Sequence, residues 1–216
     1  GSEGIYKYFF HLDPCALKPL AHAYPSLVEK NARRAVRDLL LARAKENLDA
    51  ISNLVVSTNP ATVRDGLYIL GQIEDESALG PLSKALRVSD ESVREYAIWL
   101  VSKIPGDGRQ ELLLKALHDP SEKMRLTTLR YMKETGDPGF VGPLLRVMRE
   151  RGFRALSLEE ISAWADVVAA LGGPSVAPEM EAIAGKGRFF EKRHTRVFRR
   201  ILKDAARSIR PAGENP

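Results

Sequence analysis

Residues 62–86 read TVRDGLYILGQIEDESALGPLSKAL and contain the pattern of two helices joined by a tight turn. The first half carries apolar side chains at helical spacing, namely Val63, Leu67, Ile69, Leu70 and Ile73. The polar residues 74–77 interrupt this pattern, and a second, shorter apolar face follows them. Pro81 lies in the first turn of the second face, where its missing N–H costs nothing. The segment predicts a helical hairpin, and we expect Thr62 to cap its first helix.

This hairpin belongs to a series. The earlier segment 31–55, NARRAVRDLLLARAKENLDAISNLV, shows a similar pattern at an offset of about 31 residues. The related pentapeptides ALKPL (16–20), ALGPL (78–82) and FVGPL (140–144) recur at twice that offset. A period of about 31 residues with helical apolar spacing is typical of an α-solenoid. We therefore expect an all-α chain of about eleven to thirteen helices with no β-sheet.

The same pattern organises the rest of the chain. Further hairpins are expected at 91–120 and 121–151, and a less regular one follows the connection at 149–157. The predicted parts of the chain are an aromatic N-terminal segment at 1–14, a solenoid at 15–187, a basic amphipathic capping helix at 188–210 and a disordered tail at 211–216. The aromatic residues near the N-terminus are expected to cover the first repeat, to belong to a helix of a larger protein, or to form a docking segment.

Three local features recur across these hairpins. Val-Arg or Met-Arg pairs lie in the first helices, at 63–64, 93–94 and 124–125. Gly-Asp turns follow, and a Leu-x-Pro-Leu motif opens several second helices. Over residues 15–187 this combination resembles bacterial HEAT-like repeats of the short, PBS-lyase type with about 31 residues per repeat. The resemblance implies a right-handed α–α superhelix of about five to six hairpins with a C-terminal capping helix, working as a scaffold or adaptor.

The composition limits the cellular compartments expected for the protein, but it does not indicate a function. Nothing in the chain approaches 18 consecutive apolar residues, so no transmembrane helix is expected, and no secretory signal is recognisable. Cys15 is the single cysteine and cannot form an internal disulfide. We therefore expect a cytoplasmic protein, with Cys15 acting as a small buried hydrophobic residue.

The residues that could support catalysis are few. None of the four histidines is followed by Glu, unlike in the metal-binding deoxyhypusine hydroxylases of the HEAT-like class, so no metal site is expected. No glycine-rich phosphate loop is present. Trp164 and Asp166 are compatible with a HEAT-like DNA glycosylase, but Trp164 continues an apolar helical pattern and is expected to pack in the core. We therefore expect no catalytic residue, no cofactor and no enzymatic activity.

The unusual segment is basic and lies near the C-terminus. The net charge of the chain is +5, yet residues 186–210 alone contain ten Lys/Arg against two acids, which gives +8 there. At 100° per residue most of these cations share one side of a helix, and apolar residues occupy the other, with His194 expected to pack among them. The segment is either a solvated cap or a surface for an acidic protein, nucleic acid or anionic lipid. Its candidate binding residues are Arg188, Lys192, Arg193, Arg196, Arg199, Arg200, Lys203 and Arg207.

Two functional hypotheses follow. The first is a non-enzymatic protein–protein interaction module, part of a larger bacterial protein, whose second helices line a surface that holds a protein partner. The alternative is sequence-independent binding of nucleic acid or another polyanion through the basic C-terminal helix. A third class, an enzyme of the glycosylase type, has little support in the sequence.

Overall fold

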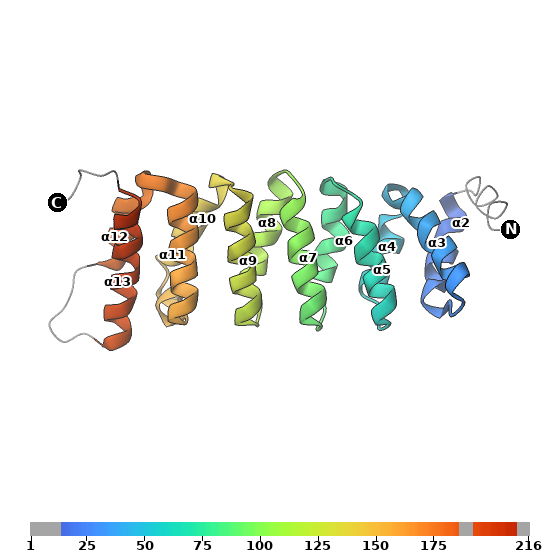
Figure 1. Cartoon of the computed structure of the whole chain (residues 1–216), viewed down its shortest axis with the longest axis horizontal. Coiled ribbons are helices and arrows are strands. Elements are labelled where there is room, and N and C mark those ends of the chain that lie inside the picture. Colours follow the sequence, from blue (N-terminus) through green and yellow to red (C-terminus); the bar gives the residue numbers. More distant parts are fainter. Residues whose placement is uncertain (1–13, 186–191, 211–216) are drawn as a thin grey trace. The chain divides into compact units, whose positions relative to one another are not determined.

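The computed structural model describes residues 14–185 and 192–210. These residues form twelve α-helices, joined by turns and short 3₁₀ segments, and contain no β-strand. The prediction of an all-α fold built from successive helical hairpins is confirmed within these residues (Figure 1). The aromatic N-terminal residues 1–13, Arg188 and the tail 211–216, for which predictions were made above, lie outside the described residues.

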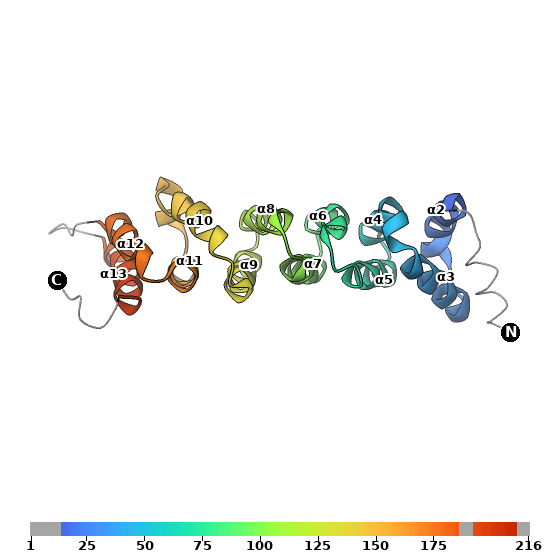
Figure 2. The same ribbon diagram turned by 90° about the horizontal axis from the view of Figure 1, so that it is seen from above.

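The chain divides into two compact units, with the boundary between Leu112 and Leu113. In the first unit, α3, α5 and α7 lie side by side in one layer, and α2, α4 and α6 form a second layer (Figure 2). The helices of this unit are α2 (Pro14–Ala23), α3 (Lys30–Ala42), α4 (Leu48–Val55), α5 (Pro60–Gly71), α6 (Leu79–Ala85) and α7 (Glu91–Lys103), and α8 (Asp107–Ala116) contains the boundary.

The second unit repeats this two-layer arrangement. The helices α9, α11 and α13 lie in one layer, and α10 and α12 pack against them from the other (Figure 2). Their bounds are α9 (Glu122–Thr135), α10 (Val141–Met148), α11 (Leu158–Gly172), α12 (Ala177–Ala184) and α13 (Arg193–Ser208). The capping helix was predicted at 188–210, and its described part is α13.

The first helices begin at a regularly spaced capping residue. The Asn59 side chain accepts hydrogen bonds from the backbone N–H groups of Ala61 and Thr62, at 2.9 and 3.4 Å. Asp90 caps α7 in the same way, one repeat later. The prediction that Thr62 caps the helix is therefore wrong, because Pro60 already occupies the first helical position, where proline is favoured. Thr62 is instead fully buried.

This spacing of caps also corrects the register of the Val-Arg pairs. Arg94 and Arg125 are each the fourth residue after a cap, at Asp90 and Ser121, whereas the fourth residue after Asn59 is Val63. The Arg94 guanidinium donates to the carbonyl oxygens of Val88 and Ser89 at 2.9 and 2.8 Å. Arg94 therefore ties the start of its own helix to the preceding loop.

The core follows the predicted apolar positions. Leu70 of α5 and Leu100 of α7 are 1% and 5% exposed. The caps at Asn59 and Asp90 place these two leucines one position apart in the repeat, so the prediction that they are equivalent is wrong although both are buried. In the second unit, α13 contributes the buried residues Phe198, Leu202 and Ala206, which are spaced four residues apart on one ridge. This ridge packs against α11 and α12, so α13 covers an apolar surface that both helices would otherwise expose.

Candidate functional site

An aromatic cluster holds α13 in place. The Phe198 ring lies 6.2 Å from the Phe153 ring, which in turn lies 5.3 Å from the Trp164 ring, and both pairs meet edge to face. Trp164 is only 4% exposed, in keeping with its predicted role in packing. Asp166, the other residue considered for glycosylase chemistry, is exposed and pairs with Lys133, with 3.5 Å between the charged atoms.

The first turns of α13 present cations to solvent. Lys192, Arg193, Arg196 and Arg200 are all exposed, and none forms an ion pair with another described residue. The first turn of α13 contains no acidic residue. Because the N-terminus of a helix already carries a partial positive charge, cations here repel it unless an anion is bound nearby. We call these four residues the α13 basic surface.

The other candidate cations of this helix are not equivalent to that surface. Arg199 and Lys203 are half-buried, and Arg207 lies 3.5 Å from Asp204. Arg210, which follows α13 and is not one of the candidates, forms an ion pair of 2.8 Å with Glu181 of α12. The cations predicted to share one side of the helix are therefore not equally exposed. A 100° projection shows which residues share a sector, but it does not show how much of that sector the rest of the protein covers.

The expected packing of His194 is also wrong. The residue is exposed, because the buried ridge of α13 begins only at Phe198, one turn further along. A helical projection assigns a side, but it does not show where along the helix the neighbouring helices begin to cover it.

Sequence reasoning missed Arg154. This residue lies in the 3₁₀ segment Arg151–Ala155, within the connection that was predicted only as irregular. Its guanidinium carbon lies 5.4 Å from the centre of the Phe198 ring, and Nη2 donates to the carbonyl oxygen of Ile183 at 3.4 Å. The signal in the sequence is the density of arginines at 149–154, which are Arg149, Arg151 and Arg154.

A buried ion pair lies elsewhere in the second unit. Arg125 of α9 forms a bidentate pair with Glu160 of α11, and its Nη1 also donates to the carbonyl oxygens of Asp119 and Pro120. The hydrogen bonds to Glu160 raise the pKa of Arg125. A cavity of about 350 Å³ lies beside the pair, and its lining also includes His118, Arg146 and Glu150. Its charged lining has both signs, so it favours neither anions nor cations.

Two further observations concern metal binding and the crossing of a membrane. Within residues 14–185 and 192–210, no group of three or more His, Cys, Asp or Glu side chains is arranged to hold a metal ion. In the same residues, no helix has the length and apolar character needed to cross a bilayer.

Several solved structures are similar to this chain. Human deoxyhypusine hydroxylase in complex with glycerol is 14% identical and aligns over 91% of this chain and 75% of that chain, with a TM-score of 0.46. The Escherichia coli protein YibA is 14% identical over 89% of this chain and 67% of that chain, with a TM-score of 0.43. An engineered protein aligns over 95% of this chain and 96% of that chain at 14% identity, with a TM-score of 0.37. No family model and no curated protein matches the sequence.

These comparisons correct two functional expectations. One of the similar structures, deoxyhypusine hydroxylase, is an enzyme. The expectation that a HEAT-like solenoid works as a non-enzymatic scaffold or adaptor is therefore wrong, because this type of fold is compatible with catalysis. The expectation that the chain has no enzymatic activity fails for the same reason. At 14% identity the likeness concerns the fold, and no activity or site residue is transferred from it.

Proposed function

We propose that the second unit binds a polyanionic partner through the α13 basic surface, Lys192, Arg193, Arg196 and Arg200. The observation that carries the proposal is the division of charge along α13. The four cations of the first turns are exposed and form no ion pair among the described residues, whereas Arg207 and Arg210 are paired with acids. The proposal concerns binding alone and assigns the chain neither a scaffold role nor a lack of catalytic activity.

The spacing of these cations suits a linear anion. Arg196 and Arg200 are four residues apart on one face, which corresponds to about 6 Å along the helix axis. No Phe, Tyr or Trp side chain lies among the exposed cations, so the large aromatic rings on which successive bases stack are not part of this surface. Contacts of this kind recognise charge and not sequence, and they weaken as salt increases because counterions are released on binding.

The test compares two double variants with the same change in net charge. Arg196→Glu/Arg200→Glu reverses the α13 basic surface, and Arg64→Glu/Arg87→Glu reverses two exposed arginines of the first unit. Binding to a fluorescent DNA duplex of arbitrary sequence and to poly-L-glutamate is measured by anisotropy as a function of salt. We expect wild type and the control variant to bind alike. The α13 variant should lose most of the affinity, and the slope of log K against log salt should fall by about 2.

Two outcomes would overturn the proposal. One is that the wild-type protein binds neither probe even at about 50 mM salt. The other is that the control variant weakens binding as much as the α13 variant does, since the effect would then reflect net charge and not the surface of α13. A comparison of the two probes shows whether phosphates or carboxylates are the preferred anion.

We also infer that the chain is a bacterial, cytoplasmic protein of the short HEAT-like type. The caps Asn59 and Asp90 lie one short repeat apart, which supports that repeat class. The single cysteine supports a reducing compartment. Sequencing of the gene neighbourhood in the source organism tests the bacterial origin. Fractionation of its cells tests the cytoplasmic location.

A further inference from the structure

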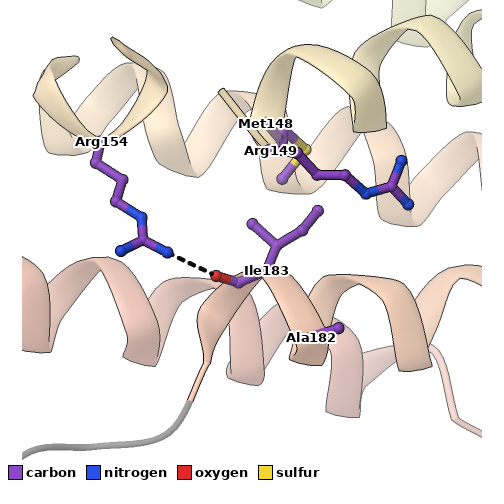
Figure 3. A pocket seen from close by; sticks show the side chains of 5 residues that line it. All are labelled: Met148, Arg149, Arg154, Ala182 and Ile183. Carbon is purple, nitrogen blue, oxygen red and sulfur yellow. Dashed lines mark hydrogen bonds between the residues drawn. The ribbon is translucent and has the colours of Figure 1, made fainter. Parts of the chain in front are cut away.

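A cavity of about 260 Å³ lies in the second unit, between the end of α10, the 3₁₀ segment Arg151–Ala155 and α12 (Figure 3). Its lining consists of Met148, Arg149, Arg154, Ala182 and Ile183. Met148 and Ile183 are 1% and 7% exposed, so the base of the cavity is apolar. Figure 3 shows the Ile183 side chain between the two arginines. No acidic side chain lines the cavity, and both of its charged groups are cations.

Two contacts orient the exposed Arg154 side chain, which keeps most of its donors. Its guanidinium lies over the Phe198 ring, and a single hydrogen bond of 3.4 Å joins Nη2 to the carbonyl oxygen of Ile183. That distance is long for an N–H···O hydrogen bond. No described residue accepts from its other N–H groups. A guanidinium presents a planar fork that matches a carboxylate in bidentate geometry, and fixing its orientation in advance reduces the entropy lost on binding.

Arg149 supplies a second cation that an incoming anion can share. It forms an ion pair with Glu179 of α12, in which the two side chains are 53% and 48% exposed. Ion pairs this exposed contribute little free energy, so an anion in the cavity competes with Glu179 at small cost.

We propose that this cavity binds an aliphatic carboxylate, with the carboxylate on Arg154 and the alkyl chain against Met148, Ala182 and Ile183. The apolar base distinguishes this ligand from a phosphate or sulfate, which has no group to place there. The volume is slightly below that of pockets for drug-sized ligands, so it suits a group about the size of a leucine side chain. A free branched-chain acid and the C-terminal residue of a peptide share this chemistry.

The test uses two matched pairs of probes. The first pair is 4-methylpentanoate and its uncharged amide. The second is a short N-acetylated peptide that ends in leucine, prepared with a free carboxylate and with a C-terminal amide. Binding is followed through the chemical shifts of the Ile183 methyl groups. We expect at least one free carboxylate to bind, and its amide to bind at least tenfold more weakly. The pair that binds identifies the source of the carboxylate as a free acid or a chain terminus.

Two variants and two controls locate the binding site. Arg154→Gln removes the fork, and Ala182→Phe fills the cavity from an exposed position, so each should weaken binding at least tenfold while the melting temperature stays close to that of wild type. Arg151→Gln removes an exposed arginine of the same 3₁₀ segment that does not line the cavity, and it should bind like wild type. Arg196→Glu/Arg200→Glu should also leave carboxylate binding within about twofold, which separates this inference from the polyanion proposal.

The inference is overturned if neither carboxylate shifts the Ile183 methyl signals, or if each acid and its amide bind equally well. It is also overturned if Arg154→Gln, once shown to be folded, binds as tightly as wild type.

Discussion

Arg125 and Glu160 form a bidentate ion pair between α9 and α11, with 2.6 Å from Nε to Oε1 and 2.9 Å from Nη2 to Oε2. Glu160 is 2% exposed, whereas the Arg125 side chain is 20% exposed. The pair joins residues 35 positions apart, and Arg125 also binds the loop before its own helix. It therefore couples two neighbouring repeats through one guanidinium.

We expect Arg125→Met to lower the free energy of unfolding by about 3 kcal/mol, because it leaves the Glu160 carboxylate buried without its partner. Replacing both residues, as Arg125→Met/Glu160→Leu, should recover much of that loss, since no unpaired charge then remains. Urea titration of wild type and both variants measures the effect. A double variant less stable than Arg125→Met would contradict this explanation.

The cap of α5 gives a second prediction, with a matched control on α9. Asn59→Ala removes two hydrogen bonds to backbone N–H groups and should destabilise the protein by about 1 kcal/mol. Ser121 occupies the same position on α9, but its side chain makes no capping hydrogen bond, so Ser121→Ala should cost less than about 0.5 kcal/mol. Chemical denaturation of the two variants compares them directly, and equal costs would argue against the assigned cap.

The burial of two leucines in the first unit predicts the cost of truncating them. Leu70→Ala and Leu100→Ala should each lower the free energy of unfolding by about 2–4 kcal/mol, because both side chains are buried in the interior of the first unit. The exposed Lys84 offers a control, and Lys84→Ala should change stability by no more than about 0.5 kcal/mol. A loss below about 1 kcal/mol for either leucine would show that its side chain is not part of the core.

Tyr24 predicts a loss of stability at alkaline pH. Burial raises the pKa of its hydroxyl, and the hydrogen bond to Asp65 at 2.7 Å raises it further. Because the folded state favours the neutral phenol, its contribution is complete below the unfolded pKa of about 10 and is lost as the pH rises above that value. Melting temperatures of wild type and Tyr24→Phe at pH 9 and 11 provide the measurement. The wild type should lose more stability than Tyr24→Phe over this interval. Identical losses would contradict the prediction.

Much of the fold could be read from residues 62–86 and their repeats, because helical periodicity is a local property of the chain. That pattern predicted the hairpins, the absence of a sheet and the burial of Leu70 and Leu100. The caps were harder to assign, since Asn59 and Thr62 are both good capping residues and only the position of Pro60 within the helix decides between them. The buried Glu160 was not predicted, because its partner lies on another helix.

By itself, the sequence determined the repeat, the helical class and the concentration of positive charge near the C-terminus. Only the tertiary structure decided which cations are available. It left Arg196 and Arg200 exposed, covered part of Arg199 and paired Arg210 with Glu181 of α12. It also brought Arg154 to the carbonyl of Ile183 and the ring of Phe198. The physical reason is that spacing along one helix specifies which side chains share a face, whereas the helices packed against it determine which faces remain in water.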